Sequence, residues 1–195
     1  MDIHPFSGAR VAEFGAGTGR VTRIMSVLVE RIEAFDTAPA MLREAQRVLS
    51  ESGMENWSLA LADNRAVPLA ADSADLAVEG WSFGHVMGWH GAAWQRQLDA
   101  MLAEMARVTK AGGSLVLIET MGTGQRQPQA PTAALAKMYA YLENDLGFSY
   151  RWIRTDYQFA SVAEADELMR FFFGDEMADQ LVAGKNVRIP ECTGI

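Results

Sequence analysis

Short apolar segments alternate with longer segments of helical period along the first 120 residues of the chain. The first pair is 10–14, which has the composition of a strand, and 20–30, where apolar residues recur at helical spacing. Further strands are expected at 31–35, 57–61, 75–79 and 114–119, and further helices from Pro39 and over 92–110. Parallel strands need a crossover between them, usually a helix. The sequence therefore predicts an α/β fold with a doubly wound, mostly parallel sheet and helices on both faces.

The pattern changes after Thr120. A loop rich in glycine and proline precedes an expected helix at 132–146, and the aromatic run 149–159 predicts one long strand. Ser161 and Glu164 match a capping box, which opens another helix. The last ten residues approach a final strand, which the chain leaves visibly incomplete. We expect a single domain over 1–195, with a ligand-binding core at 10–120 and a C-terminal part at 121–195.

Composition excludes several classes of protein. No apolar run approaches the roughly 20 residues of a membrane helix, and the N-terminus lacks the features of a signal peptide. Cys192 is the only cysteine, so no internal disulfide can form, and a cytoplasmic location is expected. The net charge of -8 disfavours nucleic acid as a partner, because phosphate backbones select basic surfaces. No metal site and no membrane association are predicted.

The most informative motif is Glu13-Phe14-Gly15-Ala16-Gly17-Thr18-Gly19-Arg20, which lies between the first strand and the first helix. Glycine allows a sharp turn and close approach of a ligand to the backbone. Ligands of open α/β sheets bind at this carboxyl edge. A dinucleotide-binding loop of the G-x-G-x-x-G type would need a third glycine where Arg20 stands.

The order G-x-G-x-G with an acid two residues before it resembles the first motif of class I, Rossmann-like S-adenosylmethionine-dependent methyltransferases. The resemblance continues at Asp36, where such enzymes hold the ribose hydroxyls, and at Asp63, where they bind the adenine amine. It implies a seven-stranded type of sheet, S-adenosyl-L-methionine as cofactor, and an enzyme that transfers a methyl group. The implied cofactor residues are Glu13, Gly15, Ala16, Gly17, Thr18, Gly19, Asp36, Thr37, Asp63, Asn64, Glu79 and Gly80.

The proposed ligand is cationic and carries no phosphate, so acceptors and negative charge suit it. A pyrophosphate would instead prefer backbone donors without a carboxylate nearby. Each acid also has a structural alternative as a solvated strand end, although three acids at three successive strand ends favour a common site.

The acceptor side is predicted from the loop after the fourth strand, 79–85. It lacks the Asn/Asp-Pro-Pro-Tyr/Phe sequence that methylases of exocyclic nucleobase amines share, which favours a small-molecule acceptor. His85 is the candidate base, with a surface role as its alternative. Trp81 and Glu119 are candidates for the acceptor pocket; Trp81 could equally be core.

Three functional hypotheses remain open from the sequence. The first is a methyltransferase acting by in-line displacement, the second a nicotinamide-dependent oxidoreductase, and the third a non-catalytic S-adenosylmethionine-binding module. Compared with the family, only nine residues precede the first strand and the last strand is unfinished. Either the sequence is a fragment, or a partner subunit in a homo-oligomer covers the open edge.

Overall fold

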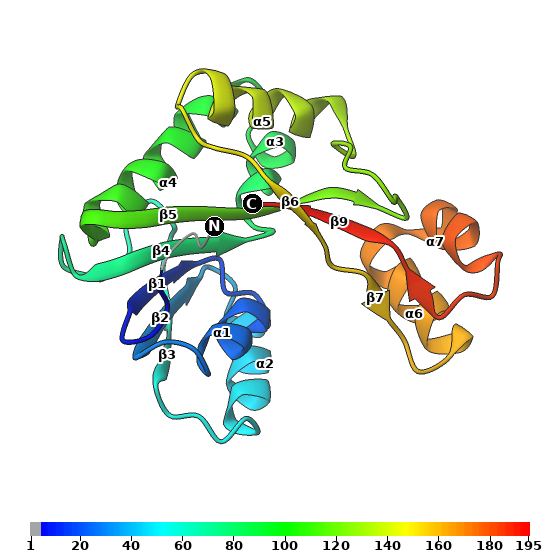
Figure 1. The fold of residues 1–195 in the computed structure, drawn as a ribbon, viewed down its shortest axis with the longest axis horizontal. Helices are drawn as coiled ribbons and strands as arrows, with labels where there is room; N and C mark the ends of the chain where they lie inside the picture. Colours follow the sequence, from blue (N-terminus) through cyan, green and yellow to red (C-terminus); the bar gives the residue numbers. More distant parts are fainter. Residues whose placement is uncertain (1–4) are drawn as a thin grey trace. The chain divides into compact units, whose positions relative to one another are not determined.

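The computed structural model describes residues 5–195, without the side chain of Val182. Seven strands form one sheet in the order β3-β2-β1-β4-β5-β9-β6 (Figure 1). Their bounds are β1 Arg10–Phe14, β2 Arg31–Asp36, β3 Trp57–Leu61, β4 Ala74–Gly80, β5 Thr109–Thr123, β6 Trp152–Arg154 and β9 Glu191–Gly194. Strands β1 to β5 pair in parallel, whereas β6 and β9 are antiparallel. This architecture confirms the predicted fold class.

The chain divides into two compact units, of which the first ends at Glu119 and the second spans Thr120–Ile195. Helices of the first unit are α1 Arg20–Met25, α2 Pro39–Ser50, α3 Val86–Trp89 and α4 Trp94–Val108, with short 3-10 turns η1 Phe83–His85 and η2 Gly91–Ala93. Four successive residues of β1, 11–14, are buried, as expected for a central strand covered on both faces. Helix α2 packs on β2 and β3, and α4 packs on β1 and β4.

Two element boundaries in the first unit differ from the sequence-based expectation. Helix α1 ends at Met25 rather than near residue 30, because the Asn56 Nδ2 donates to the carbonyl oxygens of Ser26 and Val29 at 2.8 and 2.9 Å. Those carbonyls are thereby satisfied without a further helical turn. Strand β5 begins at Thr109, five residues earlier than expected.

The early start of β5 depends on its two glycines. The pairing of β4 with β5 shifts register between Ala74 and Leu76, and Gly112 has φ +82°. A Cβ on Gly113 would lie 2.6 Å from the Asp75 carbonyl oxygen. The glycines therefore permit a bulge inside the strand, where the sequence suggested a helix stop before it.

The second unit contains the remaining elements. These are α5 Ala133–Asn144, β7 Tyr157–Gln158, α6 Val162–Phe173, α7 Asp175–Val182 and β8 Arg188–Ile189, besides β6 and β9. The capping box is present, since the Glu164 N–H donates to the Ser161 Oγ at 3.1 Å. Met169, Ala178 and Ile189 form a small core.

The expected long strand at 149–159 is wrong, because it is divided into β6 and β7. Strand β6 pairs with β9, whereas β7 pairs with β8 in a separate sheet. Asp156 lies at the break and accepts hydrogen bonds from the Arg154 and Arg188 side chains and from the Glu191 N–H. A set of charge-assisted bonds thus holds the chain where it leaves one sheet for the other. The final strand, which the sequence left unfinished, is formed as β9.

Candidate functional site

The glycine loop between β1 and α1 is built from left-handed backbone. Gly15, Gly17 and Gly19 have φ of +77°, +53° and +81°. A Cβ on Gly15 would lie 2.0 Å from the Ser82 Oγ, so the loop after β4 occupies the space of a side chain there. The N–H groups of Gly15 and Ala16 donate to the Phe35 carbonyl oxygen at 2.9 and 2.8 Å. The loop is therefore fixed to the ends of both neighbouring strands.

Asp36 ends β2 and faces this loop. Its Oδ2 accepts the Gly17 N–H and its Oδ1 accepts the Ala38 N–H, both at 2.8 Å. Each carboxylate oxygen has two lone pairs, so each oxygen of Asp36 can accept a second hydrogen bond. Thr18 and Thr37 are exposed on the same loops.

Glu13 lies in the interior of the first unit. It is 1% exposed and accepts the Thr22 Oγ1–H at 2.6 Å. Burial raises the pKa of Glu13 to about 7, and the hydrogen bond from Thr22 opposes this only in part. The carboxyl group thus secures α1 beside the glycine loop, and its predicted contact with a ligand stays a prediction.

Asp63 and Asn64 follow β3. Asp63 forms an ion pair with Arg65 and also accepts the Arg65 N–H at 2.9 Å, and these hydrogen bonds lower its pKa. The Asn64 Nδ2 donates to the Ser82 Oγ at 3.4 Å, whereas the Asn64 Oδ1 is buried and has no hydrogen-bond partner within residues 5–195. A buried acceptor of this kind is available to a ligand donor.

The loop after β4 completes the site. The buried Glu79 accepts the N–H groups of Ser82 and Phe83 at 3.0 and 3.2 Å. A Cβ on Gly80 would lie 2.7 Å from the Val21 Cγ2, so this position brings β4 close to α1. The loop backbone therefore turns at the carboxyl end of β4, next to the glycine loop.

Trp81 adopts a left-handed conformation that is rare outside glycine, with φ +54°. The Arg20 guanidinium carbon lies 4.3 Å from the centre of its indole ring. Left-handed non-glycine residues are found preferentially at functional sites. Arg20 and Ser82 were not among the residues predicted from the sequence, although Arg20 occupies the position where a dinucleotide loop needs glycine.

The candidate acceptor residues differ in exposure. His85 is exposed and its ring stacks on Trp89, with centroids 4.9 Å apart and planes at 11°. Glu119 is 7% exposed and accepts the Gly84 N–H at 2.6 Å. Burial raises the pKa of Glu119 to about 7. Trp81 and His85 thus lie on one loop, and Glu119 is bound to the same loop from within.

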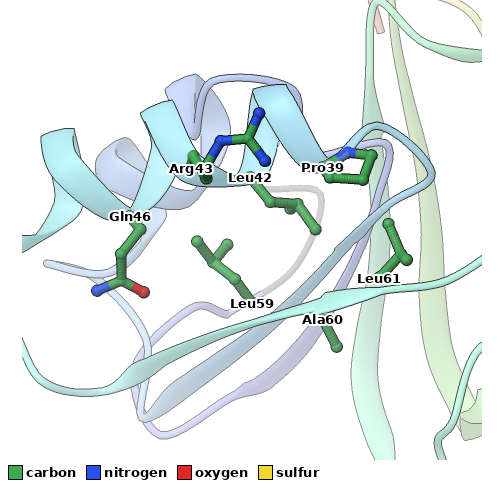
Figure 2. A pocket seen from close by; sticks show the side chains of 7 residues that line it. All are labelled: Pro39, Leu42, Arg43, Gln46, Leu59, Ala60 and Leu61. Carbon is green, nitrogen blue, oxygen red and sulfur yellow. The ribbon is translucent and has the colours of Figure 1, made fainter.

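A pocket of about 370 Å³ lies between α2 and β3, and none of these candidate side chains lines it. Figure 2 shows Leu59 of β3 beneath Leu42 of α2 and Leu61 beneath Pro39. Its lining residues are Pro39, Leu42, Arg43, Gln46, Leu59, Ala60 and Leu61, none of which was predicted as a site residue.

A sequence model of the methyltransferase domain family matches residues 11–113, which is more than half of the chain. The chain belongs to the methyltransferase domain family. The matched segment contains the glycine loop, Asp36, Asp63 and the loop after β4. The predicted membership of the class I S-adenosylmethionine-dependent methyltransferases is confirmed, and the nicotinamide alternative is not favoured.

The chain matches only part of the length of its curated relatives. The chain is 31% identical over 109 residues to malonyl-[acyl-carrier protein] O-methyltransferase of Methylococcus capsulatus, covering 55% of this chain and 36% of that protein. It is 28% identical over 141 residues to phosphatidylethanolamine N-methyltransferase of Cereibacter sphaeroides, covering 72% and 63%. The chain thus spans between about a third and two thirds of the length of these relatives.

Solved methyltransferases share the fold at low sequence identity. A putative type II methyltransferase of Anaeromyxobacter dehalogenans has a TM-score of 0.59 at 18% identity, covering 95% of this chain and 86% of that one. An S-adenosylmethionine-dependent methyltransferase of Aquifex aeolicus has a TM-score of 0.57 at 14% identity, covering 99% and 85%. Among residues 5–195, no helix is both long and apolar enough to cross a membrane.

Proposed function

We propose that this chain binds S-adenosyl-L-methionine at the carboxyl ends of β1, β2 and β4 and transfers its methyl group to a small or carrier-bound acceptor. When bound, the sulfonium group supplies a methyl carbon that is already activated for in-line displacement. The protein's part is then to hold the cofactor, to orient the acceptor and to keep water out. Membership of the methyltransferase domain family supports this proposal.

The observation that carries the proposal is the fixed position of Asp36. Its two oxygens are oriented by the N–H groups of Gly17 and Ala38 at 2.8 Å, which aims the remaining lone pairs without loss of side-chain freedom on binding. Two ribose hydroxyls are matched donors for such a carboxylate. Asp36 lies next to β1, where the strand order reverses, as expected for a ligand site of this fold.

Other residues fit the remainder of the cofactor. The buried Asn64 Oδ1 needs a donor, and an adenine amine can supply one. Asp63 is the second candidate for the adenine, held in place by Arg65. The glycine loop leaves room as well, since no heavy atom lies within 4 Å of a Cβ placed on Gly17.

We assign the acceptor to the loop after β4, with Trp81 as a wall of its pocket and His85 as the base. The two relatives named above are, by their names, an O-methyltransferase of malonyl-[acyl-carrier protein] and an N-methyltransferase of phosphatidylethanolamine. Both acceptors are small groups carried by a larger partner, and both have an anionic portion, so these are the acceptor classes to test. We also propose that residues 1–195 act as a single domain, that the protein is cytoplasmic and that it forms a homo-oligomer.

The test is calorimetry with S-adenosylhomocysteine and with NAD on the wild-type chain and on Asp36→Ala. We expect binding of S-adenosylhomocysteine only, weakened by about 1.5–3 kcal/mol, or roughly 10- to 150-fold, in Asp36→Ala. Asp75→Ala is the matched control, because Asp75 also binds a backbone N–H, that of Arg10 at 2.9 Å, but at the amino end of the sheet. Binding of NAD, or equal effects of the two substitutions, would refute the assignment.

Turnover is tested separately by release of S-adenosylhomocysteine with malonyl thioesters and with ethanolamine phospholipids. Binding without product from either class would favour the non-catalytic binding module over the enzyme.

A further inference from the structure

Two buried glutamates bind three consecutive N–H groups of the loop after β4. The Glu79 Oε2 accepts those of Ser82 and Phe83 at 3.0 and 3.2 Å, and the Glu119 Oε1 accepts that of Gly84 at 2.6 Å. The Glu79 Oε1 also accepts the Ile118 N–H of β5 at 3.2 Å. Two neighbouring strands thus hold the loop through carboxyl groups.

Burying two carboxyl groups without a cationic partner costs free energy, which a purely structural contact would not need. In the described part of the chain, each hydrogen bond accepted by Glu79 and Glu119 comes from a backbone N–H, so neither carboxylate has a cationic partner there. Burial raises the pKa of Glu79 well above its usual range, and the charge of Glu119 raises it further. Two buried carboxylates that repel each other cannot both ionise easily, so the pair releases its protons at higher pH than exposed glutamates do.

The other charged groups around the pair are few and can be distinguished from it. On β1, the neighbour of β4, Glu13 is buried and bound to Thr22. On the loop itself His85 is exposed and stacked on Trp89. From α1, Arg20 lies over Trp81.

We propose that Glu79 and Glu119 form a carboxylate clamp, a pair of positioning residues that fixes the backbone of Ser82–Gly84 from two neighbouring strands. Through this backbone the clamp sets where Trp81 and His85 lie. Only the statement that this loop faces the acceptor rests on the proposed function. In the clamp Glu119 acts through Gly84, and the direct acceptor contact expected from the sequence stays a prediction. Ionisation of the pair as the pH rises changes the acceptor end of the site and leaves the Asp36 end unchanged.

The clamp is tested by following backbone amide resonances of the ligand-free protein from pH 5.5 to 8.5. We expect the amides of Ser82, Phe83 and Gly84 all to shift as the pH rises, the Gly84 amide with a midpoint near pH 7, where Glu119 titrates. The matched control is the Arg65 amide, which also binds a carboxylate, that of Asp63 at 2.9 Å. Its shift should stay flat, because hydrogen bonding lowers the pKa of Asp63 out of this window.

Two variants identify the titrating groups. Glu119→Gln keeps an oxygen for the Gly84 N–H but removes the second charge, so the midpoint seen at Ser82 and Phe83 should fall by about one pH unit. His85→Gln should leave all three titrations unchanged. Flat amide shifts in the wild type, or titrations that vanish in His85→Gln, would overturn the clamp. If Glu119→Gln does not fold, the wild-type and His85→Gln titrations still decide.

The measurement needs neither cofactor nor acceptor. A failure of the clamp is therefore distinguishable from a failure of the proposed methyltransferase, which would appear as absent S-adenosylhomocysteine binding. Where binding is present, Glu119→Gln should change the affinity for S-adenosylhomocysteine less than about twofold, because Asp36 and the glycine loop are untouched. A tenfold loss would show a direct cofactor role for Glu119 and would contradict a clamp that acts on the acceptor loop.

Discussion

Different kinds of contact stabilise the interior of each of the two units. In the first, carboxylates and carbonyl oxygens at the strand ends bind the N–H groups of loops, as Asp36 binds Gly17 and Glu79 binds Ser82. In the second, a small apolar core supports helices that leave Phe171 and Phe172 79% and 68% exposed. The family match, 11–113, lies entirely in the first unit. The comparison teaches that the proposed site depends on polar fixation of loops at strand ends, whereas the helices α6 and α7 of the second unit rest on a small apolar core.

The largest expected effect tests the loop contacts of the first unit. In Gly15→Ala the new Cβ would lie 2.0 Å from the Ser82 Oγ, so we expect loss of measurable S-adenosylhomocysteine binding and about 3 kcal/mol of stability. Gly8→Ala is the matched control, because Gly8 has nearly the same φ, +76°, but no atom within 4 Å of its Cβ. It should lose about 1 kcal/mol and no affinity. Urea unfolding and calorimetry would measure both, and equal losses in the two variants would contradict the proposed close packing.

The second prediction concerns the apolar core of the second unit. Met169→Ala removes a side chain that is 1% exposed, and we expect a loss of roughly 2–4 kcal/mol in unfolding free energy. Phe171→Ala, at an exposed position, should cost less than about 0.5 kcal/mol. Both variants should retain the affinity for S-adenosylhomocysteine, measured by calorimetry below the unfolding temperature. A weaker affinity in folded Met169→Ala would show that the core of the second unit contributes to ligand binding.

The third prediction uses the pH dependence of the first unit. Because the pKa of Glu13 is about 7 in the folded chain and near 4.5 otherwise, the folded state binds the proton more tightly. The associated stability is present at acidic pH and is lost as pH rises through about 7. Glu13→Gln can still accept from Thr22 but carries no charge. Its stability relative to wild type should therefore rise by about 2.5 kcal/mol between pH 5 and 8.

Urea unfolding across that pH range checks this result. Glu44→Gln is the control, since the side chain of Arg47 lowers the pKa of the exposed Glu44, and its difference from wild type should be constant over the range. A constant difference for Glu13→Gln as well would mean that Glu13 is charged in the folded protein.

The smallest expected effect concerns Arg20. Its guanidinium lies over Trp81, and Arg20→Gln should cost about 0.5–1 kcal/mol and alter the fluorescence of Trp81. Arg23→Gln, on the same helix, should change neither the fluorescence nor the stability by a comparable amount. An unchanged tryptophan spectrum in Arg20→Gln would remove Arg20 from the description of the site.

Much of the first unit could be predicted from the sequence. The strands expected at 10–14 and 57–61 coincide with β1 and β3. The central strand β1 is buried over 11–14 and leaves a clear apolar pattern in the sequence. The glycine spacing and Asp36 also indicated the correct strand ends. The interior partners of Glu13 and Glu119 could not be predicted, since Thr22 and Gly84 are common residue types whose proximity depends on the tertiary fold.

The second unit was less predictable for a physical reason. Its strands β7 and β8 have two residues each, too short for a hydrophobic period to appear. The break at Asp156 depends on Arg188 and Glu191, which are more than 30 residues away in the sequence. Local patterns contain no information about such distant contacts, so the run 149–159 suggested one strand.

The raised pKa of Glu13 has a consequence for the heat of ligand binding. At pH 7 this carboxyl group is about half protonated, and a cation that binds near it would favour the ionised form. Protons would then pass to the solution as the ligand enters. The apparent enthalpy should consequently differ between phosphate and Tris, whose heats of ionisation are unequal, and the difference should diminish in Glu13→Gln.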